Sequence, residues 1–233
     1  MSELFPWVLP WRRPRLGPAE AQALRRWKGL AEPDRSRPAA SGRWVVVDVE
    51  TSGLDAQRDA LIAIGALAMR DGDVDLGDSF EVVLRQDAPS ADANIEVHGI
   101  GGTEQLEGEE PAAALAAFLA FIGKDPLVAY HAPFDALMLA RALARHLGLR
   151  FQRPWLDLAE VAPLAWPGLT GSRRGLDAWL EALQIPVAFR HRAIADCLAT
   201  AQLFAAFLPH APRLGAPSAA DLVDLAANRH WVR

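Results

Sequence analysis

Cysteine is almost absent from this 233-residue chain, which contains only Cys197. A single cysteine excludes a disulfide within the chain and a zinc site built from several thiolates. Long apolar runs are absent too, because charged residues, glycine or proline interrupt each stretch before the roughly 20 residues that span a bilayer. The first residues include Glu3, Pro6 and Pro10, which do not suit a secretory signal. We therefore expect no membrane contact and, by default, a cytoplasmic location.

Acidic residues outnumber basic ones, and the formal net charge of −5 is unusual for a protein that binds nucleic acid. The charge is unevenly distributed. Residues 1–43 contain nine Lys/Arg and four Asp/Glu, a net +5, whereas the rest contains fifteen and twenty-five, a net −10. An acidic body with a basic arm is compatible with a nuclease, because a site of carboxylate ligands is strongly negative until cations bind.

The composition divides the chain into three expected parts. Residues 1–43 form a basic, tryptophan-containing arm, with one short helix over 18–30 and a linker rich in Pro, Ser, Arg, Ala and Gly after it. Residues 44–210 form the main domain, and 211–233 form a C-terminal extension with a short helix over 221–227. With 51% hydrophobic residues, the chain can bury a substantial core.

Hydrophobic periodicity predicts an α/β fold. Runs of β-branched and apolar residues separated by short turns predict three strands in an antiparallel meander, followed by alternating helices and one further strand. Such an outline matches a ribonuclease H-like architecture, a mixed sheet flanked by helices. The expected strands lie at 44–50, 60–69, 78–84 and 127–130, and the expected helices at 111–122, 133–147, 176–183 and 194–207.

Two acids end the first expected strand. Asp48 and Glu50 are two residues apart, so both carboxylates point to the same face of the sheet. Neighbouring carboxylates repel each other unless a positive charge lies between them, and a hard divalent cation prefers such oxygen ligands. Taken alone, the pair is equally compatible with a strand end that frays into solvent and whose acids are hydrated.

Two further segments place polar residues at helix starts. Asp135 lies in the first turn of an expected helix, where the helix dipole favours an acid even without a metal. His191 and Asp196 are separated by about 500° on an ideal helix, so they converge only if His191 lies on the preceding loop. By itself, His191 is better explained as a solvated loop residue.

In their order, these residues form one set that resembles the DEDDh 3′→5′ exonuclease family. That family includes the proofreading subunit of bacterial DNA polymerase III, ribonuclease T and oligoribonuclease. The resemblance covers residues 44–210 and is strongest toward the proofreading group. Its supporting motifs are Val-Val-Val-Asp-Val-Glu-Thr-Ser-Gly-Leu-Asp (45–55), Val-His-Gly-Ile (97–100), Ala-Pro-Phe-Asp (132–135), Trp-Leu-Asp-Leu-Ala (155–159) and Leu-Asp-Ala-Trp-Leu (176–180).

The resemblance implies phosphodiester hydrolysis assisted by two divalent cations, Mg²⁺ or Mn²⁺. The implied ligands are Asp48, Glu50, Asp135 and Asp196. His191 is implied as the general base, a role that suits an imidazole with an ordinary pKa of about 6.5.

The resemblance also implies contacts with the substrate. Thr51 is expected to touch the terminal nucleotide, and Leu54 to wedge against the terminal base. His98 is expected to line the pocket, and Phe134 to pack either near the terminal sugar or in the core. Unpaired bases can stack on apolar and aromatic surfaces, so single-stranded DNA 3′ ends are the expected substrate.

Two positions depart from the family pattern. His131 replaces a common Asn beside Ala-Pro-Phe-Asp and is expected to donate a hydrogen bond near the substrate, and Gly101 replaces a common Thr. Two alternative functions stay open. The first is an RNA exonuclease of the ribonuclease T or oligoribonuclease kind. Such an enzyme differs from a DNA exonuclease in recognising the 2′-hydroxyl of the substrate, and no motif in this sequence indicates whether that group is recognised. A non-catalytic nucleic-acid-binding module is disfavoured because all five catalytic positions are filled.

The arm also allows two interpretations. Its tryptophans Trp7, Trp11 and Trp27 alternate with arginines, a pattern that guides nucleic acid by charge and stacking or reaches a polymerase or repair partner. Alternatively, the tryptophans dock onto the main domain and the arginines face solvent. Arg173 and Arg174 likewise either touch phosphate or are only solvated.

Overall fold

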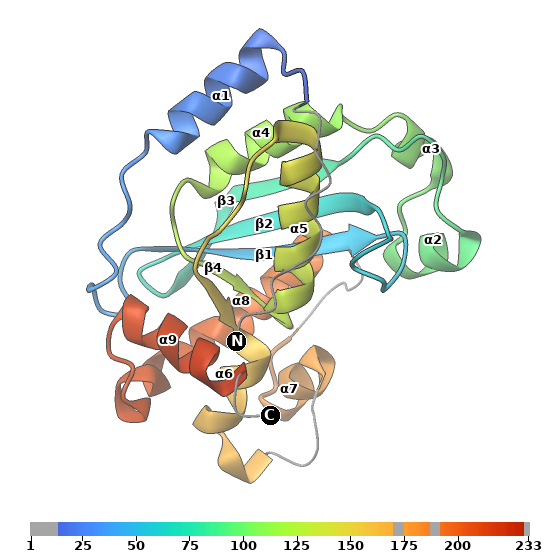
Figure 1. The fold of residues 1–233 in the computed structure, drawn as a ribbon. Helices are drawn as coiled ribbons and strands as arrows, with labels where there is room; N and C mark the ends of the chain where they lie inside the picture. Colours follow the sequence, from blue (N-terminus) through green and yellow to red (C-terminus); the bar gives the residue numbers. More distant parts are fainter. Residues whose placement is uncertain (1–13, 170–174, 187–191, 231–233) are drawn as a thin grey trace, which may run out of the picture.

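The structure, a computed structural model, describes residues 14–169, 175–186 and 192–230 of the chain. A five-stranded sheet in the order β3-β2-β1-β4-β5 forms its centre, with helices on both faces (Figure 1). The predicted mixed sheet flanked by helices is confirmed. The strands are β1 (Arg43–Thr51), β2 (Leu61–Arg70), β3 (Asp73–Val83), β4 (Leu127–Ala129) and β5 (Trp155–Asp157).

The first three strands form the predicted antiparallel meander, and β1, β4 and β5 run parallel. The turn from β2 to β3 contains Asp71 and Gly72, both with positive φ (52° and 88°), as a tight two-residue hairpin turn requires. β3 begins at Asp73, five residues before its predicted start at 78. Acidic residues are depleted in strands, so its first half reads as a loop in sequence. They are tolerated here because β3 is an edge strand.

The two faces of the sheet carry different helices, and each has its own apolar core. One core lies between the sheet, α4 and α5, and α1 packs on α4 (Figure 1). The other lies under α6, α7, α8 and α9. The helices are α1 (Pro18–Lys28), α2 (Asp92–His98), α3 (Gly102–Leu106), α4 (Pro111–Ile122), α5 (Ala132–Leu147), α6 (Leu158–Ala165), α7 (Leu176–Ala182), α8 (Ala193–Phe207) and α9 (Ala219–His230), with 3-10 turns η1 (Pro167–Leu169) and η2 (Leu208–Leu214).

Strand β1 divides its side chains between the two cores. Val45, Val47 and Val49 are buried toward α4 and α5, whereas Trp44 and Val46 are buried toward α8. This period of two is that of a pleated strand covered on both faces. The two residues that follow on the α8 face are carboxylates, so the pattern that builds the core also brings charge to its edge.

Trp27 shows how α1 is attached. Its side chain is 6% exposed, its Nε1–H donates to the carbonyl of Gly123 at 2.6 Å, and Lys124 Nζ lies 3.4 Å from its ring centre. For Trp27, these contacts agree with the docking interpretation. Trp7 and Trp11 lie outside the described residues, as do Arg173 and Arg174.

Helices α1 and α9 flank the predicted main domain. Each packs on the central layers, α1 on α4 and α9 on β5 and α6. These contacts join the flanking segments to the two cores, so the packing does not mark a domain boundary at 43 or at 210. Both boundaries therefore stay predictions.

One segment differs from the expectation that no stretch could span a membrane. Ala193–Leu214 is helical, and its length and composition suffice for a span. Half of its apolar window is buried inside the fold, and Phe204 and Phe207 are fully buried in the core. The core helix of a folded domain has the same composition, so this property is weak evidence for a membrane.

Candidate metal centre

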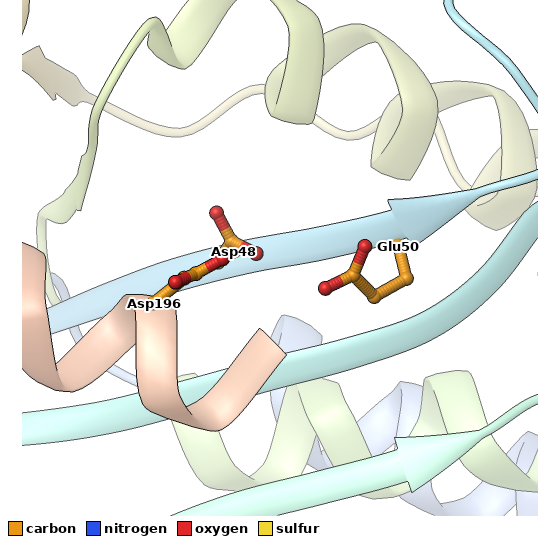
Figure 2. A group of neighbouring side chains, drawn as sticks. All are labelled: Asp48, Glu50 and Asp196. Carbon is orange, nitrogen blue, oxygen red and sulfur yellow. The ribbon is translucent and has the colours of Figure 1, made fainter. Parts of the chain in front are cut away.

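Three carboxylates meet beside the end of β1. Asp48 and Glu50 project from the α8 face of the strand, and Asp196 projects from the first turn of α8 (Figure 2). One oxygen from each residue can be chosen so that the three lie within 4.8 Å of one another. All three side chains are half-buried. The structure thus brings together acids that lie far apart in the sequence.

Helix α8 begins at Ala193, and its first turn positions Asp196. Arg192 is extended at the N-cap, and its carbonyl accepts a hydrogen bond from the Asp196 N–H at 2.9 Å. Asp196 therefore lies in the first helical turn, where the backbone dipoles favour a negative charge. His191, the predicted general base, lies outside the described residues, so its role stays a prediction.

Asp135 approaches the same strand end from the opposite helix layer. It lies in the first turn of α5, and its side chain is 5% exposed. The backbone N–H groups of Val49 and of Asp135 itself hydrogen-bond its carboxylate, and Glu50 acts on it electrostatically. A role in capping α5 alone therefore does not account for the hydrogen bond that the Val49 N–H in β1 donates to the Asp135 carboxylate. Asp135 is not one of the three residues of this group, and its interactions with Val49 and Glu50 put it next to them.

Burial makes these acids hard to ionise. It raises the pKa of Glu50 to about 7, with further increases from the charges of Asp196 and Glu81. Burial also raises the pKa of Asp135 to about 8, with smaller increases from Asp157 and Glu50. Crowded, half-buried carboxylates are costly unless cations neutralise them.

The donor atoms fit a hard divalent cation. Carboxylate oxygens are the ligands that Mg²⁺ and Mn²⁺ prefer, and the three oxygens within 4.8 Å are close enough to share one ion. Cys197, the one thiol in the chain, follows Asp196 and is fully buried in the core. Burial raises the pKa of that thiol well above its usual value. A soft thiolate ligand is therefore not offered at this position.

The last residue of β1 and the loop after it carry two predicted substrate contacts, Thr51 and Leu54. Thr51 Oγ1 donates to the carbonyl of Gly53 at 2.7 Å, so its hydroxyl shapes the turn. Leu54 is 92% exposed. The Asn94 side chain from α2 donates to the carbonyl of Ser52, which ties this loop to α2. Leu54 thus projects freely from an anchored loop.

His98, the residue predicted to line the substrate pocket, is buried at the end of α2. Its side chain is 2% exposed, and its Nδ1 accepts a hydrogen bond from the N–H of Ile100 at 3.0 Å. Burial lowers the pKa of this imidazole. The ring supports the turn after α2, so the structure does not present it on an open surface.

His131 and Phe134 lie at the start of α5. His131 is exposed and left-handed at the N-cap (φ 66°), and its backbone N–H donates to Asp157 Oδ1 at 3.0 Å. Its ring stands edge-on to Tyr130 at 4.8 Å. Phe134 is partly buried and packs on the α4–α5 core, as one of its two interpretations expects.

Asp157, which the sequence offers only as part of the Trp-Leu-Asp-Leu-Ala motif, is a further carboxylate near Asp135. It ends β5, caps α6 through the N–H of Ala159 at 3.0 Å and holds the backbone of His131. Its charge also contributes to the raised pKa of Asp135. The sequence signal that could have identified Asp157 is an acidic residue at the carboxyl end of a parallel strand, where ligands commonly bind.

Comparisons with known proteins agree with this geometry. A family model described as exonuclease matches residues 45–204. A DNA polymerase III PolC-type protein of Thermotoga petrophila is 30% identical over 183 residues, which are 78% of this chain and 13% of that protein. A DNA polymerase III subunit epsilon-like protein of Rhodobacter capsulatus is 33% identical over 171 residues, 71% of this chain and 24% of that protein. The chain therefore spans only a small part of these relatives.

Solved structures share the fold. Escherichia coli Exonuclease I in complex with a dT13 oligonucleotide superposes with a TM-score of 0.62 at 21% identity, covering 75% of this chain and 43% of that chain. Exonuclease X in complex with 5′ overhanging duplex DNA superposes with a TM-score of 0.59 at 21% identity, covering 78% of this chain and 99% of that chain. These matches confirm the predicted ribonuclease H-like arrangement.

Proposed function

Because this chain belongs to the exonuclease family, whose model matches residues 45–204, we propose that it removes nucleotides one at a time from the 3′ end of DNA by metal-dependent hydrolysis. The observation that carries this proposal is the group of three carboxylate oxygens within 4.8 Å, with Asp135 beside it. DNA is favoured over RNA because relatives at 30% and 33% identity bear DNA polymerase III names. Exonuclease I and Exonuclease X, which share the fold, are bound to a dT13 oligonucleotide and to duplex DNA in their solved structures.

Two divalent cations, Mg²⁺ or Mn²⁺, are proposed as cofactors. The oxygen ligands would be Asp48, Glu50, Asp135 and Asp196. Bound cations would supply Lewis acidity, which makes an attacking water more acidic and a departing 3′ oxygen more stable. Two ions rather than one are favoured because four carboxylates at one strand end carry more negative charge than a single cation neutralises.

The chain's own residues would bind, orient and move a proton. Leu54 would press against the terminal base, while Thr51 and the start of α5 at His131 and Phe134 would border the terminal nucleotide. His191 would accept the proton of the attacking water. Attack at phosphorus forms the new P–O bond and breaks the bond to the 3′ oxygen of the preceding nucleotide, which releases a nucleoside 5′-monophosphate.

The proposed partners follow from this reaction. Single-stranded DNA 3′ ends suit a site beside an exposed leucine, because unpaired bases can stack against it. A polymerase or repair partner, reached through the basic N-terminal arm, is proposed because the relatives with DNA polymerase III names are several times longer than this chain.

Digestion of matched DNA and RNA strands tests the proposal. The purified protein is incubated with 5′-labelled oligonucleotides of the same sequence, with Mg²⁺, with Mn²⁺ and with a chelator. We expect a ladder of progressively shorter labelled DNA products that requires the metal. Release of a labelled mononucleotide at the start would indicate the opposite polarity. Exclusive digestion of RNA would reject the DNA assignment, and no metal-dependent shortening of either strand would reject the enzyme.

A further inference from the structure

Gly65, in the middle of β2, lies directly beneath the first turn of α8. A Cβ placed on this glycine would lie 2.4 Å from the carbonyl carbon of Ala193 and 2.6 Å from the amide nitrogen of Ile194. Both are backbone atoms, so no side-chain rotation can relieve the contact. The backbone of Gly65 does not have positive φ, and glycine is therefore required by space rather than by conformation.

The register of the sheet places this contact beside the metal ligands. Gly65 is the residue opposite Asp48 in the antiparallel pair of β1 and β2. Directly opposite residues of such a pair point to the same face of the sheet. The space that a side chain at 65 would occupy is therefore next to the Asp48 carboxylate, on the side covered by α8.

The same helix turn carries the third ligand. Asp196 lies three residues after Ala193, and Cys197 packs against the backbone of Asp48, which donates a hydrogen bond to its sulfur. The distance of α8 from the sheet thus sets how far Asp196 lies from Asp48 and Glu50. Relieving the clash from 2.4 Å to an ordinary 3.4 Å contact requires a movement of about 1 Å.

We propose that Gly65 is a positioning residue of the metal centre, whose missing side chain lets α8 approach β2 closely enough for Asp196 to share a cation with Asp48. This inference rests on the proposed metal-dependent function. A displacement of 1 Å is large for a cation that demands regular oxygen coordination. The alternative is that Gly65 only permits dense packing, with no specific effect on the metal.

The decisive variant is Gly65→Ala, and Gly77→Ala is its matched control. Gly77 also lies in a strand, β3, but a Cβ there would meet only Asp75 Oδ1, at 3.4 Å. Mn²⁺ affinity is measured by calorimetry without substrate, next to kcat and KM for a single-stranded DNA. For Gly65→Ala we expect Mn²⁺ affinity to fall at least about tenfold and kcat to fall much more than KM changes. For Gly77→Ala we expect neither.

A rescue experiment separates positioning from general destabilisation. Asp196→Glu, with a side chain one methylene longer, is combined with Gly65→Ala. We expect Asp196→Glu alone to weaken Mn²⁺ binding, and to recover part of the lost affinity in the Gly65→Ala background because the longer side chain spans the wider gap. A purely structural role would give additive losses in the double variant, and additive losses would overturn the proposal.

The structure of metal-free Gly65→Ala gives a test that does not depend on activity. We expect the Asp196 carboxylate to lie farther from Asp48 than in the wild-type protein. An unchanged spacing, or a folded variant with wild-type Mn²⁺ affinity, would overturn the inference. If the wild-type protein degrades neither DNA nor RNA, the proposed function fails, while the Mn²⁺ titration and the metal-free spacing still decide the role of Gly65.

If Gly65→Ala does not fold, Cys197 offers a second point of contact. Cys197 lies about one helical turn after Ala193 and is fully buried between α8 and the sheet. Because valine is larger than cysteine, Cys197→Val should push α8 away from the sheet at that turn. Cys197→Ala is the control that does not enlarge the side chain. We expect weaker Mn²⁺ binding for the valine variant than for the alanine variant. Equal affinities in these two proteins would contradict the proposed role of helix spacing.

Discussion

The two ends of β1 carry opposite kinds of residues on one face of the sheet. At the first end, Trp44 is fully buried, its Nε1–H donates to the carbonyl of Ala39 at 2.8 Å, and its ring meets Phe204 edge-on at 5.2 Å. At the other end, Asp48 and Glu50 are half-buried beside Asp196. The strand, the face and the covering helix are the same, and only the residue types differ.

This difference shows which end of β1 stabilises the fold and which end destabilises it. The tryptophan end buries apolar area and satisfies its polar atom, which stabilises the fold. At the carboxylate end, burial raises the pKa of Glu50 to about 7, which means that the ionised carboxylate destabilises the metal-free fold. Binding sites commonly contain such destabilising groups, because a bound ligand stabilises them. Substitutions at the two ends should therefore separate stability from activity.

The largest effect is expected from removal of one ligand charge. Asp48→Asn should lower the exonuclease rate by about 10³-fold, roughly 4 kcal/mol of transition-state stabilisation. The melting temperature of the metal-free protein should stay the same or rise, because one repelling charge is gone. Product formation and thermal unfolding measure the two quantities. The exposed Asp73, changed to Asn, is the control, and equal activity of both variants would refute the ligand role of Asp48.

The opposite behaviour is expected at the tryptophan end. Trp44→Ala should lower the free energy of unfolding by about 3–5 kcal/mol, because it removes a fully buried aromatic side chain. The kcat of the folded fraction should change little. Urea unfolding and single-turnover assays measure these effects, with Trp44→Phe as a smaller truncation. A large loss of kcat in folded Trp44→Ala would show that the two ends are coupled.

A smaller effect is expected from pH. The pKa of Glu50 is raised from 4.5 to about 7 in the folded protein, so the folded state holds a proton that the unfolded chain releases. The stabilising contribution of Glu50 to the metal-free protein should therefore be complete below pH 4.5 and be lost as pH rises through about 7, a loss of about 2 kcal/mol. Mg²⁺ or Mn²⁺ should reverse this decline.

Urea unfolding at acidic and alkaline pH, with and without metal, tests this linkage. Glu50→Gln cannot ionise, so it should remove much of the pH dependence. If wild-type and Glu50→Gln proteins lose stability equally as pH rises, Glu50 is not the group responsible.

The smallest effect is expected from Leu54, which is 92% exposed at the carboxylate end. Leu54→Ala should leave the free energy of unfolding within about 0.5 kcal/mol. It should raise KM for single-stranded DNA several-fold, about 1 kcal/mol of lost base contact. Steady-state kinetics and urea unfolding measure both, and Leu76→Ala, exposed on β3, is the control. An unchanged KM would remove Leu54 from the proposed substrate contacts.

Much of the fold could be predicted because its signals are local. The helix over 111–122 is found with the predicted bounds, with Pro111 in its first turn and Gly123 after its end. Helices α2 and α3, and strand β5, were missed because they are short and have a smaller share of apolar residues than the equally short α7 and β4, which were predicted. Helix α6 was missed as well, and it contains Pro163 in its interior, a residue that ordinarily argues against a helix.

The candidate site divides in the same way. Asp48 and Glu50 were recognisable because two residues on one strand share a face. The burial of His98 was not recognisable, since it depends on the turn formed after α2. The anchoring of His131 by Asp157 joins the ends of two neighbouring parallel strands, and nothing local signals it. The base role of His191 stays a prediction.

By itself, the sequence determined which acids are candidates for the site and on which elements they lie, because residue type and period are local properties. Only the tertiary structure decided how far apart these acids are and how costly their charges become. Those quantities depend on burial and on the close approach of α8 to β2 over Gly65, a contact between backbone segments distant in the chain. The raised pKa of Glu50 and the 4.8 Å grouping with Asp196 follow from that packing.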